Sequence, residues 1–319
     1  MKIVILDAFT TNPGDLSWDR FNELGEVTAY DYTPEDQIIE RCKDAEIIID
    51  NKVVLNKDVL DKLPKLKYIG MLSTGFNVID TQAAKEKGII VCNVPTYSTA
   101  AVAQLTFALI LEIYNQVGIH NEAVHSGEWS SCRDFCFHKT PLIELSGKTI
   151  GLIGYGKIGS EVAKIADAFS MNILCYVPST KPQPNFKNFS FVSLDEIAKQ
   201  SDIVSLHCPL TPQTTGIINE NFISKMKRNA IIINTSRGHA IDEQALADAL
   251  NSGRIAGAGV DVLSTEPPNE NNPLLSCSKC FITPHIAWAG YETRERLVGV
   301  VYNNLKSFLS GNPVNVVNK

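Results

Sequence analysis

The most informative segment of this chain is Thr149-Ile-Gly-Leu-Ile-Gly-Tyr-Gly-Lys-Ile-Gly159. It contains three glycines in the pattern Gly154-x-Gly156-x-x-Gly159, directly after an apolar run typical of a buried strand. Apolar residues with the period of a helix follow, namely Ile158, Val162, Ile165, Ala166 and Phe169. In such a strand–turn–helix unit the first glycine permits a tight turn, the second lets a pyrophosphate approach the backbone, and the third lets the helix pack against the strand. The pattern therefore predicts a dinucleotide-binding turn, with a purely structural turn as the alternative.

The rest of the chain also alternates between short apolar runs and amphipathic stretches. Nine runs are candidate strands: Lys2–Leu6, Glu46–Asp50, Lys67–Leu72, Ile89–Cys92, Thr149–Ile153, Asn172–Val177, Asp202–Leu206, Ala230–Asn234 and Gly257–Asp261. Helices are predicted between them, for example over Lys157–Phe169 and Asp242–Leu250. This alternation predicts an α/β protein built on open, doubly wound parallel sheets.

The length of 319 residues suits two domains. One long helix is predicted from Ala100 to about His125, and a polar, weakly periodic stretch follows from Ser126 to Thr140. A new strand–helix series begins at Thr149. The long helix therefore marks the region where the domains divide.

Composition narrows the class of protein. The formal net charge of -6 argues against nucleic acid as a partner, because phosphate contacts need clustered Lys and Arg. The longest apolar stretch, Ala100–Ile113, is interrupted by Gln104 and Thr106 and is shorter than a membrane span of about 20 residues. The short apolar run after Met1-Lys2 does not resemble a signal peptide. We expect a soluble, cytoplasmic protein.

The eight cysteines fit a reducing compartment, since several lie in apolar strand-like runs. Cys277-Ser-Lys-Cys280 has the spacing of half a zinc site, but no second pair follows it. We therefore predict no metal.

The cofactor is not fully specified by the glycine turn. The second strand, Asn172–Val177, is expected to end in Asp or Glu, which binds the ribose 2′-hydroxyl of NAD. Here it ends in Val177, and Pro178-Ser179-Thr180-Lys181 follows. Hydroxyls and a lysine suit the 2′-phosphate of NADP, and no carboxylate is present there to repel it. The sequence favours NADP or dual use, with NAD and an ordinary polar loop as the alternative.

Arg237 is a candidate for substrate binding. It lies in Asn234-Thr-Ser-Arg-Gly238, directly after an apolar strand, and the carboxyl ends of such strands are where these sheets bind ligands. A guanidinium offers a rigid fork that suits a carboxylate. A surface salt bridge is the alternative.

His285 and Glu266 are candidates for proton transfer. His285 follows another apolar strand in Phe281-Ile-Thr-Pro-His285, and Glu266 follows the strand that ends at Asp261. A carboxylate paired with histidine favours the imidazolium, which is the proton donor needed to reduce an oxo acid. A buried, hydrogen-bonded histidine is the alternative. The other histidines (His120, His125, His138, His207 and His239) are predicted to be surface, interface or strand-end residues.

Taken in order, these motifs resemble the D-isomer-specific 2-hydroxyacid dehydrogenases. The resemblance rests on the glycine turn, Leu206-His-Cys-Pro-Leu-Thr211, Asn234-Thr-Ser-Arg-Gly238, Gly259-Val-Asp-Val-Leu263 with Glu266-Pro267, and Thr283-Pro-His285. It also includes Leu72-Ser-Thr-Gly-Phe-Asn-Val-Ile-Asp80 and Val94-Pro-Thr-Tyr-Ser-Thr99, so it covers essentially the whole chain. Within the family the chain most resembles glycerate dehydrogenases, also called hydroxypyruvate reductases.

The resemblance implies a Rossmann-type cofactor domain, residues 99–286, inserted into a flavodoxin-like substrate domain, residues 1–98 and 287–319. It implies an active site in the cleft between them. Arg237 then binds the substrate carboxylate, His285 donates the proton, and Glu266 orients His285. The resemblance also implies that the backbone of Ser73, Thr74 and Gly75 cradles the carboxylate.

Further cofactor contacts follow from the same resemblance. Asp261 is expected to hold the nicotinamide amide, and the others are Gly154, Gly156, Lys157, Ile158, Gly159, Val177, Ser179, Cys208, Pro209, Thr235 and Ser236. The helix from Ala100 and the arm 126–140 are expected to build a homodimer. Lys52 and Phe135-Cys136-Phe137 remain unassigned, beside the substrate pocket or in the arm.

The implied reaction is reduction of hydroxypyruvate or glyoxylate by NAD(P)H, or its reverse. The alternatives are a D-lactate-type or broad 2-oxoacid reductase, a phosphoglycerate dehydrogenase, and an NAD(H)-sensing corepressor-like binding protein. An activity assay distinguishes the corepressor-like protein from the enzymes, since a binding module has affinity for the nucleotide without reducing small oxo acids.

Overall fold

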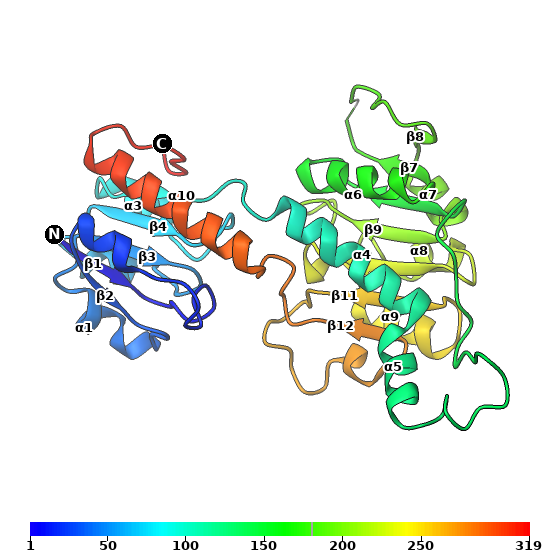
Figure 1. Ribbon diagram of the computed structural model, residues 1–319. Helices are drawn as coiled ribbons and strands as arrows, with labels where there is room; N and C mark the ends of the chain where they lie inside the picture. Colours follow the sequence, from blue (N-terminus) through cyan, green and yellow to red (C-terminus); the bar gives the residue numbers. More distant parts are fainter. Residues whose placement is uncertain (180) are drawn as a thin grey trace. The chain divides into compact units, whose positions relative to one another are not determined.

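The computed structural model describes residues 1–179 and 181–319. The chain forms two compact units: Met1–Ser98 with Ala289–Lys319, and Thr99–Trp288 (Figure 1). The second unit is therefore inserted into the first. The resemblance implied a boundary after residue 286, and the second unit extends to Trp288.

The first unit is built on a five-stranded parallel sheet. Its strands are β1 (Lys2–Ile5), β2 (Glu26–Ala29), β3 (Ile47–Asp50), β4 (Tyr68–Met71) and β5 (Ile90–Cys92), in the order β2-β1-β3-β4-β5. This is the flavodoxin-like order. β3 and β4 are buried along their whole length, as expected for strands covered on both faces.

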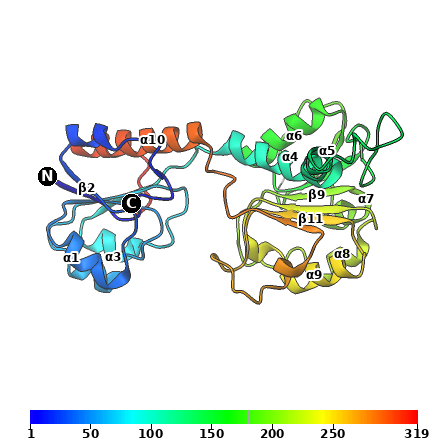
Figure 2. The same ribbon diagram turned by 60° about the horizontal axis from the view of Figure 1, so that its bottom comes forward.

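Helices cover both faces of this sheet (Figure 2). The helices of this unit are α1 (Ile38–Cys42), α2 (Lys57–Asp61), α3 (Thr81–Glu86), α10 (Tyr291–Leu309) and the 3-10 turns η1 (Asp19–Glu23) and η2 (Glu35–Gln37). α1, α2 and α3 pack on one face through residues such as Ile38, Leu60 and Ala84. α10 covers the other, where the ring of Phe308 lies 4.8 Å from that of Tyr68 of β4.

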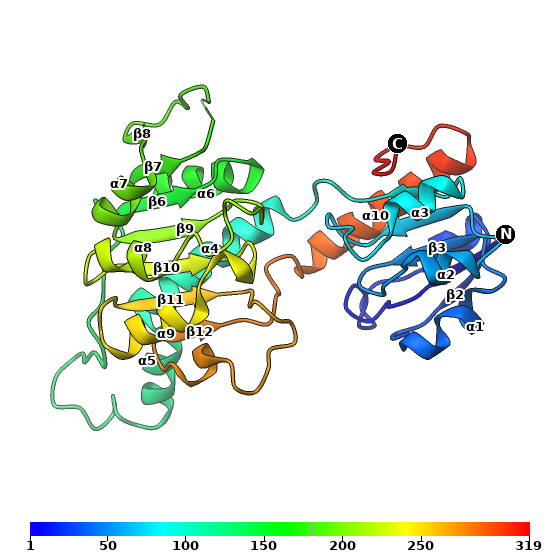
Figure 3. The same cartoon turned by 180° about the vertical axis from the view of Figure 1, so that it is seen from behind.

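The second unit contains a seven-stranded parallel sheet (Figure 3). Its strands are β6 (Thr149–Ile153), β7 (Asn172–Tyr176), β8 (Phe189–Phe191), β9 (Ile203–Leu206), β10 (Ile231–Asn234), β11 (Gly257–Val260) and β12 (Cys280–Ile282). They follow the order β12-β11-β10-β9-β6-β7-β8. The strand order reverses between β6 and β9, the point at which Rossmann-type sheets bind dinucleotides.

Helices again lie on both faces of the second sheet. The elements are α4 (Thr99–Asn115), α5 (Val117–His125), α6 (Lys157–Ala168), α7 (Leu194–Gln200), α8 (Glu220–Lys225), α9 (Glu243–Asn251), η3 (Gly238–Ala240) and η4 (Pro273–Ser276). α4 and α6 share one core with Leu152 and Ile233 of the sheet. α7, α8 and α9 share the other with Val204 and Ile232.

The structure differs from the secondary structure predicted from the sequence at three elements. The long helix expected from Ala100 to about His125 is two helices, bent by 55°, because Gln116 adopts a left-handed conformation with φ 44°. The edge strands β2 and β8 were not predicted, since β2 is mostly exposed and short edge strands have a weak apolar signal.

Among the described residues, no single helix is long and apolar enough to cross a membrane. Only α4 and α5 taken together, across their bend, reach the length and apolar composition of a membrane span.

Candidate active site

The glycine turn lies between β6 and α6, where the strand order reverses. Gly154 has a φ of +105°, and a Cβ built there lies 2.6 Å from the carbonyl oxygen of His207, which follows β9. A Cβ on Gly159 lies 2.3 Å from the carbonyl oxygen of Gly154. Both positions therefore exclude a side chain, because the turn packs against β9 on one side and α6 on the other.

Gly156 differs from these two glycines. A Cβ built on it meets nothing within 4 Å, and its φ of -91° is open to other residues. The packing of the chain itself therefore does not require glycine there. An open cradle at this position fits a dinucleotide, whose pyrophosphate approaches the backbone at this glycine.

The start of α6 supports the same fit. α7 and α9 begin with side-chain caps, from Ser193 and Asp242 respectively. α6 begins at Gly156 without a side-chain cap, and helix N-termini bind phosphate groups through their N–H groups. Of the predicted contacts in its first turn, Lys157 is exposed, whereas Ile158 packs partly into the core beside α4.

The end of β9 forms the other side of the turn. His207 lies beneath the turn, with its Nε2 2.9 Å from Oγ of Ser205 and its Nδ1 buried without a partner among the described residues. Burial lowers the pKa of His207 to about 3. The predicted contacts Cys208 and Pro209 follow directly and are half-buried and exposed.

The segment after β7 also lies against the turn. Val177 is half-buried and packs against the core beside α6, so this position has no carboxylate for a ribose. Nζ of Lys181 donates a hydrogen bond of 2.7 Å to the carbonyl oxygen of Tyr155, in the turn itself. Ser179 is exposed, and Thr180 lies outside the described residues.

Arg237 is presented by a tightly organised loop after β10. Asn234 accepts hydrogen bonds from the N–H and Oγ of Ser236 at 3.0 and 2.9 Å, and its Nδ2 donates to the carbonyl oxygen of Arg237 at 2.9 Å. The buried hydroxyl of Thr235 lies 3.1 Å from that of Thr106 of α4. The Arg237 side chain is exposed and pairs with no carboxylate in the described part of the chain.

Gly238 brings this loop against the segment after β11. A Cβ at Gly238 lies 1.9 Å from the carbonyl carbon of Leu263. The N–H of Leu263 in turn donates to Oε1 of Glu266 at 3.1 Å. The Arg237 loop and the Glu266 loop are therefore held in direct contact.

His285 and Glu266 form a direct pair. Nδ1 of His285 lies 2.6 Å from Oε2 of Glu266, and the two side chains are 33% and 36% exposed. His285 adopts a left-handed backbone conformation with φ 53°, an uncommon state for a residue other than glycine. Because Nδ1 is engaged, the other ring nitrogen, Nε2, is the atom available for proton exchange.

Asp261 organises the His285 loop. Its buried carboxylate accepts hydrogen bonds from Oγ1 of Thr283 at 2.6 Å and from the N–H groups of Ile286 and Ala287 at 2.8 and 2.9 Å. Burial raises the pKa of Asp261, and these hydrogen bonds oppose that shift. The residue that the resemblance assigns to the nicotinamide amide thus holds the loop that presents His285.

The predicted carboxylate turn lies in the first unit, after β4. Oγ1 of Thr74 donates to the carbonyl oxygen of Val94 at 2.6 Å, and Nδ2 of Asn93 donates to the carbonyl oxygen of Thr74 at 2.7 Å. Oγ of Ser73 donates to the carbonyl oxygen of Gly75 at 2.5 Å. The turn is thereby tied to the end of β5, and its residues are half-buried or exposed at the carboxyl edge of the sheet.

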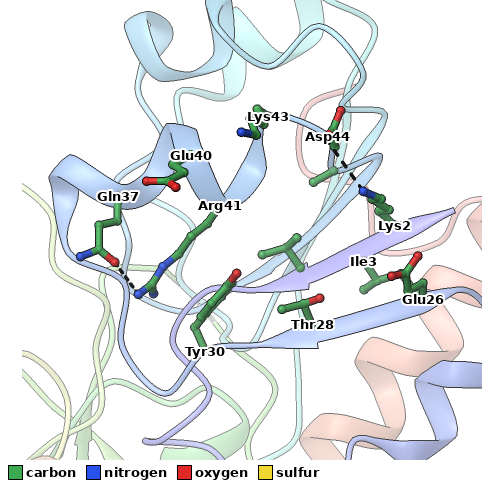
Figure 4. A pocket seen from close by; sticks show the side chains of 12 residues that line it. Lys2, Ile3, Glu26, Thr28, Tyr30, Gln37, Glu40, Arg41, Lys43 and Asp44 are labelled. Atoms are coloured by element: carbon green, nitrogen blue, oxygen red, sulfur yellow. Dashed lines mark hydrogen bonds and ion pairs between the residues drawn. The ribbon is translucent and has the colours of Figure 1, made fainter.

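A hollow of about 450 Å³ lies elsewhere in the first unit, between β1, β2 and α1 (Figure 4). None of the predicted site residues lines it. Within it, Arg41 bonds to Gln37 and lies over the ring of Tyr30, and Lys2 pairs with Asp44.

No group of three or more His, Cys, Asp or Glu side chains in the described part of the chain is arranged to hold a metal ion. Cys277 is buried and its thiol contacts the carbonyl oxygen of Pro273. Burial raises the pKa of Cys280 to about 12. Both cysteine side chains pack in the core that also contains α9.

Comparison with known proteins identifies the family. The model of the D-isomer specific 2-hydroxyacid dehydrogenase, NAD binding domain, matches residues 107–287. The chain belongs to the D-isomer-specific 2-hydroxyacid dehydrogenases. It is therefore an oxidoreductase that acts on the CH–OH group of 2-hydroxy acids and contains an NAD-binding domain.

Full-length relatives include the hydroxypyruvate reductase of Blautia hydrogenotrophica, 51% identical over 322 residues, with 100% of both chains covered. The glycerate dehydrogenase of Methylorubrum extorquens is 38% identical over 320 residues, covering 99% of this chain and 98% of that one. A solved structure of an acyclic imino acid reductase in complex with NADPH and D-Arg has a TM-score of 0.83 at 36% identity, covering 99% and 100%.

Within the second unit, the residues predicted from its motifs follow the carboxyl edge of the sheet in strand order. His285 follows β12, Asp261 and Glu266 follow β11, Arg237 follows β10, Cys208 follows β9, and the glycines follow β6. The motifs did not predict the role of Asn234, whose side chain organises the Arg237 loop.

Proposed function

We propose that this dehydrogenase reduces hydroxypyruvate to D-glycerate, and glyoxylate to glycolate, with NAD(P)H. The observation that carries the proposal is the 2.6 Å pair of His285 and Glu266 at the edge of a dinucleotide-type sheet, with the Arg237 loop packed beside it. The relatives named hydroxypyruvate reductase and glycerate dehydrogenase support the choice of substrate.

His285 is the proposed proton donor. A bound nicotinamide supplies the hydride that C2 of the oxo acid receives. Nε2 of His285 gives a proton to the carbonyl oxygen, so that hydride and proton together convert the oxo acid to the hydroxy acid. Glu266 holds Nδ1 and stabilises the positive charge of the imidazolium before the transfer.

Arg237 is the proposed carboxylate ligand. Its exposed guanidinium, which has no carboxylate partner among the described side chains, suits a planar substrate carboxylate. In the first unit, the backbone N–H groups of the turn formed by Ser73, Thr74 and Gly75 are proposed to bind a substrate carboxylate. Asp261 retains an acceptor position for the nicotinamide amide, since a carboxylate has about four and three are used in the loop.

We further propose that the enzyme accepts NADPH as well as NADH, with a preference for NADPH. Val177 offers no carboxylate to a ribose, and Lys181 lies against the glycine turn through its bond to Tyr155. Gly156, Gly159, Thr235, Ser236 and the positions after β9 are proposed to contact the rest of the dinucleotide. The relative solved with NADPH shows that a protein of this fold binds that cofactor.

A homodimer is proposed from the exposed apolar side chains after α4. Val117, Trp129, Phe135 and Leu142 are 67%, 51%, 89% and 56% exposed, and all lie between residues 117 and 142. Such a concentration of exposed apolar residues is typical of a protein interface. The molar mass in solution tests this: we expect twice the 35.0 kDa of the chain, falling toward one chain after Phe135→Glu.

A cytoplasmic location is also proposed. All eight cysteines are free thiols, as expected in a reducing compartment. Fractionation of the source cells tests it, and recovery with secreted or membrane fractions contradicts it.

The first experiment is a steady-state assay of the purified protein that combines NADH or NADPH with hydroxypyruvate, glyoxylate, pyruvate and 2-oxoglutarate. We expect the highest kcat/KM with hydroxypyruvate or glyoxylate. A clear preference for pyruvate indicates a D-lactate-type reductase instead. Nucleotide binding without turnover of any acid contradicts the proposal and favours a binding protein.

A further inference from the structure

Two buried carboxyl groups lie at the carboxyl ends of neighbouring strands of the first unit. Asp7 follows β1 and Asp50 ends β3, and the two strands pair in parallel. The residues are only 8% and 0% exposed. Buried carboxyl groups of this kind require hydrogen-bond partners, because desolvation of a charge is costly.

Asp7 finds its partners in the segment after β3. Its Oδ1 accepts a hydrogen bond from the N–H of Asn51 at 2.9 Å, and its Oδ2 accepts one from the N–H of Lys52 at 2.6 Å. Nδ2 of Asn51 also donates to Oγ1 of Thr10 at 3.1 Å. The loop after β1 therefore holds the backbone of the segment after β3.

Asp50 has a different environment. Its Oδ1 accepts from the N–H of Val53 at 3.1 Å, while its Oδ2 is buried without a partner among the described residues. Burial raises the pKa of Asp50 well above its usual range, and the charge of Asp7 raises it further. Burial thus favours the neutral form of Asp50 over its charged form.

The charged and titratable neighbours of the pair are few. Lys52 lowers the pKa of both carboxyl groups. Burial raises the pKa of the Cys42 thiol on α1 to about 12, and the charge of Asp50 raises it further. Burial raises the pKa of Asp7 to about 6, against the opposing effect of the two N–H groups. Of the two carboxyl groups, Asp7 is thus the better suited to carry a negative charge, because both of its oxygens accept N–H groups.

The segment that Asp7 holds lies beside the carboxylate turn. The N–H of Leu72 donates to the carbonyl oxygen of Asp50 at 2.7 Å, so the ends of β3 and β4 are directly adjacent. Ser73, Thr74 and Gly75 follow Leu72. Lys52 is exposed, and its Nζ forms no ion pair with a described side chain. Lys52 and the turn thus occupy the same edge of the sheet.

We propose that Asp7 is a positioning residue for the oxo-acid substrate: its ionised carboxylate holds Asn51 and Lys52 so that the Lys52 ammonium stands beside the turn of Ser73, Thr74 and Gly75. The ammonium then adds attraction for an anionic substrate at this edge. This inference rests on the proposed function, because it assigns part of the binding of the acid.

Protonation of Asp7 weakens its hydrogen bonds with the N–H groups of Asn51 and Lys52. A neutral carboxyl group has one good acceptor oxygen, since its hydroxyl oxygen is a donor, so it no longer accepts both N–H groups equally well. We therefore expect the KM for hydroxypyruvate to rise as the pH falls through the pKa of Asp7, about 6.

The test compares Asp7→Asn with the matched control Asp50→Asn in the full-length enzyme. Asn at position 7 offers one acceptor and turns an amide NH₂ toward the second N–H group. We expect amide hydrogen exchange in residues 51–53 to become about 10-fold faster, and the KM for hydroxypyruvate to rise about 10-fold. The kcat and the Kd for the reduced cofactor should change by less than about twofold, a split that general loss of structure does not produce.

Asp50→Asn keeps an acceptor oxygen for the N–H of Val53 and leaves both hydrogen bonds of Asp7 untouched. Its KM and exchange are expected to stay within about twofold of the wild type, and its KM should keep the rise below pH 6 that Asp7→Asn lacks. If Asp7→Asn leaves exchange unchanged, or if Asp50→Asn is equally damaging, the proposal is overturned. If Asp7→Asn does not fold, the pH dependence of exchange in the wild type decides in its place.

The two readouts separate this inference from the proposed function. A wild-type protein without activity on hydroxypyruvate overturns the proposed function and the substrate role of Asp7 together. Exchange that is unchanged in Asp7→Asn, in an enzyme that does reduce hydroxypyruvate, overturns the positioning role alone.

Discussion

Nδ1 of His285 lies 2.6 Å from Oε2 of Glu266, while Oε1 of the same carboxylate accepts the N–H of Leu263. The carboxylate therefore joins the imidazole to the segment against which Gly238, next to Arg237, is packed. One side chain thus sets the orientation of the ring and links the two loops that carry the proposed chemistry.

Removal of the proton donor should nearly abolish turnover. For His285→Ala we expect kcat to fall by about 100-fold or more, because general acid catalysis typically contributes at least that much. Cofactor binding should remain, since the glycine turn is untouched. A His285→Ala enzyme with near wild-type kcat contradicts the proton-donor role.

Glu266→Gln should slow the reaction less. The amide still accepts a hydrogen bond but does not stabilise an imidazolium, and a hydrogen bond to a charged group contributes about 1.5–3 kcal/mol. We expect kcat/KM to fall roughly 10- to 150-fold, measured in the same assay. A loss as large as that of His285→Ala would instead indicate that Glu266 supports the whole loop.

Because the space at Gly156 is open, a substitution there should weaken cofactor binding without lowering the stability of the fold. Gly156→Ala should leave the free energy of unfolding within about 0.5 kcal/mol, because its Cβ meets nothing. It should nevertheless weaken NADH binding by about 10-fold or more, since the Cβ occupies the cradle. Gly154→Ala is the control: its φ of +105° predicts a loss of stability above about 1 kcal/mol. Unchanged Kd in Gly156→Ala argues against a pyrophosphate at this position.

The cofactor preference should respond to the segment after β7. Val177→Asp places a carboxylate where a 2′-phosphate is proposed to bind, so the ratio of kcat/KM for NADPH to that for NADH should fall by about 10-fold or more. Lys181→Ala should lower the same ratio less. If neither variant moves it, the 2′-phosphate does not bind at this segment.

His207 predicts an acid limit of stability in the second unit. The unfolded chain takes up this proton near pH 6.5, whereas the buried imidazole stays neutral down to about 3. Stability present above pH 6.5 is therefore lost as the pH falls toward 3, by up to about 1.4 kcal/mol per unit. His207→Gln, which keeps a group to bond with Ser205, should flatten this dependence. The exposed His239→Gln should not, and equal slopes in all three proteins refute the assignment.

The kind of fold and most of the proposed site could be predicted from the amino-acid sequence. Apolar runs such as Ile231–Ile233 specify buried parallel strands, and the glycine spacing specifies the turn, because both depend on residues close in the chain. Arg237, Glu266 and His285 were located because each follows such a strand, and parallel strands end at one edge.

The features that depend on packing between distant segments could be found only in the folded structure. The exposed edge strand β2 carries little apolar signal, and the break at Gln116 is a single backbone conformation. Several contacts join residues that lie 19 to 45 positions apart in the sequence. They are the 2.6 Å contact of His285 and Glu266, the close packing of Gly238 against Leu263, and the hydrogen bonds that the N–H groups of Asn51 and Lys52 donate to Asp7. Sequence spacing does not give the distances of such contacts, since only the folded sheet brings those strand ends together.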